Sequence, residues 1–234
     1  MLPRLSVRAI EAYLARTDQC LSRSAGSGSA DTSTSAAKQP LLLAGAALQR
    51  RVARNRRRVA ELIVGQRRWF PTTAGEHVLV LCGIAQLAGL GLLPRGLFRE
   101  WPYDWARYGV NCERPLMPPH AILAALEELM GTVVNVPTLC PGERLECVAR
   151  VEWELGIGPI HPFYDGCGRT SRYYSCLLSL WLDVPLAVHT SRAAYYAAAN
   201  DGLDAFVGYF RSVARSAACP IDEDALQLPR RSSL

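Results

Sequence analysis

Residues 160–172 read IHPFYDGCGRTSR, and an apolar run, YYSCLLSLWL, follows directly over residues 173–182. Gly166 and Gly168 allow the backbone to turn tightly, and the run after them has the length and composition of a buried helix. The order therefore predicts a loop that leads into the N-terminus of a core helix. The first turn of such a helix presents N–H groups and a partial positive charge, which suits an anion such as phosphate.

Four side chains of this stretch fit the chemistry of phosphate transfer. Arg169 and Arg172 lie three residues apart in the first turn, so both guanidinium groups can reach around a polyphosphate. Asp165 offers a carboxylate oxygen, a ligand type that Mg²⁺ prefers. His161 precedes the turn, where a neutral imidazole can remove a proton from a hydroxyl group. Each residue alone has a structural explanation, but together they form the set that phosphoryl transfer requires.

The segment HPFYDGCGRTSR resembles the signature of the Fic family, HPFx(D/E)GN(G/K)RxxR, and matches eight of its nine defining positions. The resemblance covers roughly residues 75–216. Residues 108–119 resemble the family's target-positioning flap, and residues 142–160 occupy the place of the helix before the motif. The resemblance implies an all-α Fic (Fido) domain with a short flap hairpin or loop, preceded by a flexible N-terminal extension.

The resemblance also implies a reaction. A Fic domain binds ATP or another nucleoside triphosphate with Mg²⁺, and most often transfers AMP to a Ser, Thr or Tyr hydroxyl of a protein. By family role, His161 is the catalytic base and Asp165 holds Mg²⁺. The implied contacts to the phosphates and the nucleoside are Gly166, Cys167, Gly168, Arg169, Arg172, Tyr195, Tyr196 and Asn200.

Other reactions of the same family stay open. Some members transfer UMP or phosphocholine, and the Doc-type members are kinases, which usually have Lys at the position of Gly168. The glycine favours nucleotidyl transfer. A divergent enzyme acting on a small molecule and a non-catalytic nucleotide-binding module are further alternatives, although binding alone requires no base and His161 argues against the last.

Cys167 departs from the family pattern, which has Asn there. A thiol is a weak hydrogen-bond donor, and the loss of one donor to a transition-state charge costs roughly 3 kcal/mol, or about a hundredfold in rate. One alternative is a reactive Cys167, since a helix N-terminus beside arginines lowers the pKa of a thiol. A tolerated substitution or an altered substrate is the favoured explanation.

Two further features differ from the family. Residues 154–159 read ELGIGP, and two glycines with a proline predict an early end to the helix before His161. The segment TTAGEH at residues 72–77 has an acid at the spacing of the family's inhibitory helix, (S/T)xxxE(G/N), but ends in His77. An intramolecular restraint is therefore absent, or it comes from residues 1–70 or from another protein.

Composition indicates a globular protein. Half of the 234 residues are apolar and one fifth are charged, which excludes collagen-like, mucin-like and wholly disordered chains. The net charge of +5 is too mild to indicate a nucleic-acid partner. Residues 1–70 hold 13 basic and 4 acidic side chains, whereas the remainder holds 13 and 17, so the positive charge belongs to the leading segment.

Four segments are expected along the chain. They are an N-terminal helix with a Ser/Gly/Ala-rich flexible linker over 1–40, a basic amphipathic helix over 41–70, the Fic-like domain over 71–218 and a tail over 219–234. Within the domain, helical patterns run over 75–91, 119–131, 142–156, 169–182 and 191–216, and no segment alternates as a strand. A solvated helix face is the commoner explanation for the basic cluster at 50–58, although it could contact acidic protein, anionic lipid or nucleic acid.

The eight cysteines form no C-x-x-C pair, so we expect reduced thiols and a cytoplasmic protein. Residues 78–93, the longest apolar stretch, are too short for a transmembrane helix, which needs about 20 residues. The serine-rich leader would also suit export as a bacterial effector. The expected partner is a hydroxyl-bearing protein or a small-molecule substrate. The target, a regulator and any homo-oligomer are not fixed by the sequence.

Overall fold

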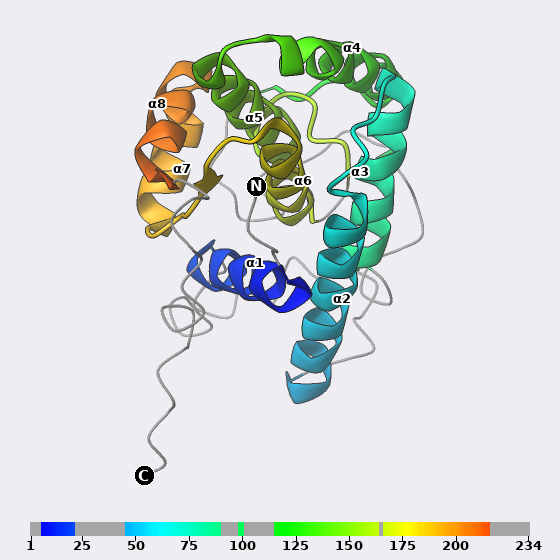
Figure 1. Ribbon diagram of the computed structural model, residues 1–234, viewed down its shortest axis with the longest axis vertical. Coiled ribbons are helices and arrows are strands. Elements are labelled where there is room, and N and C mark those ends of the chain that lie inside the picture. Colours follow the sequence, from blue (N-terminus) through cyan, green and yellow to red (C-terminus); the bar gives the residue numbers. More distant parts are fainter. Residues whose placement is uncertain (1–5, 22–44, 90–97, 101–114, 164–165, 216–234) are drawn as a thin grey trace.

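The structure is a computed structural model that describes residues 6–21, 45–89, 98–100, 115–163 and 166–215 (Figure 1). In these ranges the chain is all-α, as expected. The helices are α1 (Val7–Leu21), α2 (Gly45–Gln66), α3 (Ala74–Gly89), α4 (Ile122–Asn135), α5 (Pro141–Gly156), α6 (Cys167–Leu182), α7 (Arg192–Asp201) and α8 (Leu203–Val213). Two 3-10 turns, Pro119–Ala121 and Val136–Thr138, flank α4. The expected linker and most of the expected flap lie outside the described residues.

Helix α6 is the central helix, and the others are arranged around it (Figure 1). Its side chains are buried on nearly every side, including Tyr173, Tyr174, Leu177 and Leu178 at 0–1% exposure. Its apolar side chains are stabilised by this burial, and its buried serines, threonine and Arg172 lie mainly in the first half of the helix. The motif loop that precedes α6 is therefore attached to a helix at the centre of the core.

The N-terminal helices α1 and α2 pack into the same core. Ile10 and Leu14 of α1 and Val59 and Ile63 of α2 are fully buried. The hydroxyl of Tyr13 donates a hydrogen bond to the carbonyl of Ala187 at 2.8 Å, so α1 is also fixed to the opposite end of the chain. This packing brings polar residues of α1 and α2 against the start of α6.

The last expected helix, over 191–216, is two helices and a short strand. Gly202 separates α7 from α8 with φ of +131°, a conformation that non-glycine residues rarely adopt. After α8 the chain forms β2 (Ala214–Arg215), which pairs antiparallel with β1 (Leu186–Ala187). The sequence predicted no strand in this domain, and β1 and β2 show that this prediction was wrong. Each strand has only two residues, which is too short for an alternating pattern to be visible in the sequence.

Residues Pro119–Thr138, with α4 at their centre, are the one described segment long and apolar enough to cross a membrane by length and composition. Its apolar stripe of Ile122, Leu126, Met130 and Val133 is buried in the protein. The adjacent carboxylates Glu127 and Glu128 lie on the other side of the helix. This pattern is typical of a core helix with one wet face.

The acid at residue 76 has a local structural role. Its carboxylate accepts hydrogen bonds from the backbone N–H groups of Thr72 and Thr73 at 2.8 and 3.1 Å, and its own N–H donates to the Thr73 hydroxyl at 3.3 Å. Such reciprocal bonds satisfy the free N–H groups at a helix start. The TTAGEH segment is thus the N-terminal cap of α3.

His77 is buried in an aromatic cluster with Phe70, Tyr174 and Trp181, and its Nδ1 lies 2.8 Å from the Tyr174 hydroxyl. Burial lowers the pKa of His77 to about 4. Between pH 6.5 and pH 4 the unfolded chain therefore binds a proton that the folded chain does not, and stability falls as the pH falls.

We expect the free energy of unfolding to decrease by about 2 kcal/mol more in the wild type than in His77→Gln when the pH is lowered from 7.5 to 5. Glutamine can keep a hydrogen bond to Tyr174 but does not titrate. Urea unfolding of both chains at both pH values measures this difference. Equal losses would mean that the folded protein accepts the proton on His77.

Candidate functional site

The start of α6 has the backbone geometry of an anion site. Gly166 adopts a left-handed conformation with φ of +78° and ends the loop, and its carbonyl accepts the first helical hydrogen bond from Thr170 at 2.8 Å. The N–H groups in the first turn of this 16-residue helix have no acceptor within the helix, and they point out of its N-terminal end. Tyr164 and Asp165 lie outside the described residues, so the residue expected to hold Mg²⁺ is not placed.

His161 is held as a neutral base. Its Nδ1 lies 2.8 Å from the carbonyl of Gly156, which can only accept, so Nδ1 carries the proton and Nε2 carries the lone pair. Burial, with a smaller effect of the nearby Arg99 guanidinium, lowers the pKa of His161 to about 3. An anion bound nearby would raise this pKa, because negative charge favours the imidazolium.

The backbone at His161 is in an unusual conformation. Its φ is +31°, which costs a non-glycine residue of the order of 1–3 kcal/mol. Strain of this kind persists only where surrounding contacts fix the chain. At His161 the side chain and the backbone are both fixed, as expected for a residue whose position matters more than its local stability.

Arg99 fixes the backbone of this loop. It is 1% exposed, and its guanidinium donates to the carbonyls of His161 at 2.9 Å, Ile160 at 3.4 Å and Met117. Its own N–H donates to the carbonyl of Pro162 at 2.8 Å. A buried arginine on backbone carbonyls provides five donors in a rigid plane, so it determines the path of the loop.

The glycines before His161 allow two close approaches. A Cβ on Gly156 would lie 2.8 Å from the Ser171 hydroxyl, so α5 and α6 touch at this point. A Cβ on Gly158 would lie 2.5 Å from the Cα of Glu154. The expectation that these glycines end the helix is confirmed at Gly156, the last residue of α5. Gly156 also contacts both sides of the motif, because its carbonyl lies 2.8 Å from Nδ1 of His161 and its Cα faces Ser171 of α6.

We expect Gly158→Ala to lower the free energy of unfolding by about 1–3 kcal/mol, because the new methyl group meets backbone that cannot rotate away. Gly131→Ala is the matched control. Gly131 lies within α4 with open space where the Cβ would be, so the same change there stabilises by about 0.5–1 kcal/mol. Urea unfolding compares the three chains, and a neutral Gly158→Ala would contradict the close packing.

Both motif arginines lie at the start of α6 and contact a carboxylate from α1. Nη1 of Arg172 lies over Gly168, where a Cβ would be 3.1 Å away, so a larger residue there would shift the guanidinium by a few tenths of an ångström. Nη2 of Arg172 lies 3.7 Å from Asp18, and Nε of Arg169 lies 4.0 Å from it. Arg56 of α2 approaches the same carboxylate at 3.6 Å, and the Tyr173 hydroxyl donates to it at 2.5 Å.

Asp18 therefore stands in the place where an anion would meet the arginines. A carboxylate and a phosphate compete for the same guanidinium donors. The structure thus provides a contact between the leading 70 residues and the motif, through a residue that the sequence pattern did not single out.

The buried side chain of Cys167 contacts the backbone of Phe163, at the other end of the motif loop. Its sulfur lies 3.1 Å from both the N–H and the carbonyl oxygen of Phe163, and the side chain is 2% exposed. Phe163 is itself buried and stacks on Phe98 with 6.0 Å between ring centroids. The thiol thus ties the two ends of the turn together, as a side-chain amide at this position could also do.

The residues expected near the nucleoside lie in different environments. The Tyr195 ring is 1% exposed, within a cluster of His189, Phe206 and Tyr209. Burial raises the pKa of Tyr195 well above its usual value, and the nearby Arg172 guanidinium offsets part of that rise. Tyr196 is half-buried below the guanidinium of Arg192, 4.6 Å from the ring centroid. Asn200 is exposed near the end of α7. Tyr195 and Tyr196 both lie close enough to Arg172 to act on its pKa, and Tyr195 has the larger effect.

A buried polar chain lies behind Arg172. The Glu152 carboxylate accepts a hydrogen bond from the Ser175 hydroxyl at 2.6 Å and lies 3.3 Å from Nε2 of His189. Burial alone would raise the pKa of Glu152, but His189, Ser175 and Arg172 together hold it below its usual value. Glu152 is therefore an ionised group that places negative charge beside the buried side of Arg172.

Similarity to known proteins was found among solved structures. No family model matches the chain, and no curated protein matches it. Six chains of solved structures are similar, and one is described as the crystal structure of a Fic family protein from Desulfovibrio desulfuricans G20. That alignment has 17% identity and a TM-score of 0.49, and covers 96% of this chain and 66% of that one. The chain thus spans slightly less than two thirds of the length of that protein.

Proposed function

We propose that the chain is a Fic-type nucleotidyltransferase that moves AMP from ATP to a Ser, Thr or Tyr hydroxyl of a protein. The observation that carries the proposal is the state of His161. Its imidazole is neutral, and its tautomer is fixed with the lone pair on Nε2. In the chain, this base comes shortly before a helix whose first turn holds two arginines. A site that only binds an anion requires no proton acceptor, so the base favours a catalytic role.

In the proposed reaction, Nε2 of His161 takes the proton of the target hydroxyl while the hydroxyl oxygen attacks the α-phosphorus of ATP. An oxygen–phosphorus bond forms to the target, the bond from the α-phosphorus to the bridging oxygen breaks, and pyrophosphate leaves. The N–H groups at the start of α6 would lie on the phosphate oxygens. Arg169 and Arg172 would hold the leaving phosphates and offset their charge.

The nucleotide fits the donors that the structure shows, since guanidiniums at a helix N-terminus suit a polyphosphate. Mg²⁺ would add positive charge to the phosphates, and the resemblance assigns it to Asp165. Tyr195 is buried close to Arg172, so its ring would limit the space in which that guanidinium moves. A second reaction, phosphoryl transfer, is favoured by Cys167, whose sulfur is turned to the backbone of Phe163 and replaces an amide donor.

The test uses purified chain, Mg²⁺ and a cell lysate, with ATP labelled at the α- or the γ-phosphate in parallel reactions. His161→Asn is the control, because asparagine adopts a positive φ readily and keeps the loop conformation. We expect α-label on a protein band with the wild type and none with His161→Asn. Transfer of γ-label alone would indicate a kinase, and transfer of neither would contradict ATP-dependent protein modification.

A further inference from the structure

We propose that Arg56 of α2, which lies outside the motif, is a third phosphate-binding arginine that completes a site for the terminal phosphoryl group of a nucleoside triphosphate. This inference deepens the proposed function and rests on it for the identity of the ligand. The site consists of Arg56, Arg169, Arg172 and the Tyr173 hydroxyl, and Asp18 lies at its centre.

The distances show that a carboxylate is too small for this site. Of the four residues of the site, only Tyr173 is within hydrogen-bond distance of the Asp18 carboxylate, at 2.5 Å. The nitrogen–oxygen distances from Arg56, Arg172 and Arg169 are 3.6, 3.7 and 4.0 Å, whereas a charge-assisted hydrogen bond is about 2.7–2.9 Å long. A tetrahedral phosphoryl group, with three terminal oxygens pointing in different directions, can reach all three arginines at once.

Two guanidinium nitrogens of the site also lack a hydrogen-bond acceptor within the described ranges. In the part of the chain that the structure describes, Nε of Arg56 and Nε of Arg172 are buried and meet no hydrogen-bond acceptor. A buried donor without an acceptor is unfavourable by about 1–3 kcal/mol, and native proteins rarely leave one at random. Oδ1 of Asp18 also meets no donor among the described residues, so the arginines and this carboxylate are poorly matched. Such a mismatch is expected where the ligand of the arginines is a larger anion with oxygens in more directions.

The charges favour a dianion. Three guanidiniums meet the single negative charge of Asp18, and Glu152 adds a second negative charge behind Arg172. Positive charge therefore remains in excess, by one with Asp18 in place and by two if Asp18 withdraws. A terminal phosphoryl group carries nearly two negative charges at neutral pH. Among the common intracellular anions, this charge and shape belong to the end of a polyphosphate.

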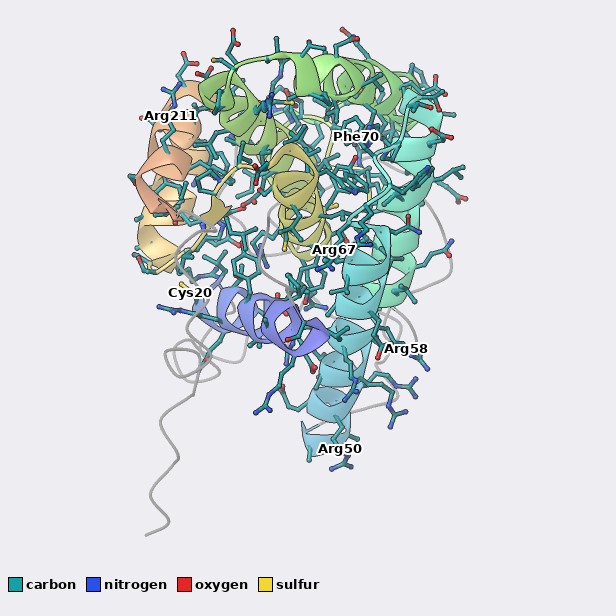
Figure 2. The ribbon with its side chains drawn as sticks, in the orientation of Figure 1. Cys20, Arg50, Arg58, Arg67, Phe70 and Arg211 are labelled. Carbon is teal, nitrogen blue, oxygen red and sulfur yellow. The ribbon has the colours of Figure 1, made fainter. Side chains whose placement is uncertain are left out.

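The side chain of Arg56 differs from its neighbours on α2. It is 18% exposed and turned to Asp18, whereas Arg57 pairs with Glu61 at the surface. Arg58 is exposed and lies on the outer side of α2 (Figure 2). The basic helix thus has two kinds of arginine, one that faces the motif and several that face water.

The experiment measures dissociation constants of ATP, AMP and tripolyphosphate by calorimetry, in the full chain with Asp18→Asn as the common background. Added Arg56→Gln is expected to weaken ATP and tripolyphosphate at least about tenfold and to change AMP less than twofold, since AMP has no terminal group. Added Arg58→Gln removes the same charge from the outer side and leaves all three constants within twofold. Added Arg56→Lys keeps the charge, loses the forked donors and gives an intermediate loss.

Each other result is decisive. If ATP binds the background protein and Arg56→Gln leaves its affinity unchanged, the inference fails and the proposed function stands. Equal weakening by Arg56→Gln and Arg58→Gln, or equal weakening of ATP and AMP by Arg56→Gln, overturns the site as well. If tripolyphosphate binds through Arg56 but ATP does not bind, the phosphoryl site is supported and the proposed nucleotide reaction fails. Failure of both probes to bind the background protein overturns both.

Discussion

The Asp18→Asn chain is expected to bind ATP at least about tenfold more tightly than the wild type, which corresponds to about 1.4 kcal/mol. Asp18 lies among three arginines and competes with phosphate for their donors. Asparagine has nearly the same shape and can still accept the hydrogen bond from Tyr173, so the change removes the charge and little else. Calorimetric titration of both chains with ATP gives the two dissociation constants.

The control is Glu11→Gln, which removes one negative charge from the same helix about two turns away from Asp18. We expect its affinity for ATP to stay within twofold of the wild type. If Glu11→Gln raises the affinity as much as Asp18→Asn, the effect is one of net charge. An unchanged affinity in Asp18→Asn would contradict the competition between the carboxylate and phosphate.

Arg99→Met is expected to lower the free energy of unfolding by about 3–5 kcal/mol. Methionine fills the space of the arginine stem but leaves the carbonyls of Met117, Ile160 and His161 without their buried donor. Each such loss costs about 1–3 kcal/mol. The loop that holds His161 loses its support. The proposed transferase activity should therefore fall more than the stability loss alone explains, at temperatures where the chain stays folded.

Arg144→Met is the matched control for Arg99. The Arg144 guanidinium also donates to three backbone carbonyls, those of Pro137, Leu139 and Leu182, but it lies at the surface of the protein. Water can replace its hydrogen bonds, so we expect a loss below about 1.5 kcal/mol. Urea unfolding at neutral pH compares the two variants. Equal losses would mean that burial of Arg99 contributes nothing.

The motif itself could be predicted from the sequence, because its residues are close in the chain. The glycines, His161 and the two arginines lie within twelve residues, and the apolar run after them predicts a buried helix. The structure places Gly166 as the left-handed residue before α6 and Arg172 over Gly168, so local sequence was sufficient for this part.

The residues that complete the site could not be predicted, because they reach it only through packing of distant segments. Asp18, Arg56 and Arg99 come from α1, α2 and the segment 98–100, and no spacing relates them to the motif. Arg56 lies within a run of arginines that is typical of a solvated helix face. Its approach to Asp18 depends on which side of α2 packs against α1 and α6.

The helices could be predicted where the apolar pattern is long. The prediction failed where the conformation of a single glycine ends a helix. Gly202 divides the expected helix over 191–216 because of its positive φ, and nothing in the flanking pattern changes there. The glycines at 156 and 158 were expected to interrupt a helix, but their second role, the close contact of α5 with Ser171 and with its own turn, depends on the tertiary structure.

The proposed function requires that His161 and the arginines of α6 form one site that transfers AMP. The most direct test counts two products of the Asp18→Asn chain with Mg²⁺, labelled ATP and a lysate, namely the pyrophosphate released and the α-label bound to protein. We predict equal amounts of the two, and the loss of both when His161→Asn is added. ATP that binds tightly but yields neither product, or product formation that survives His161→Asn, would contradict the claim.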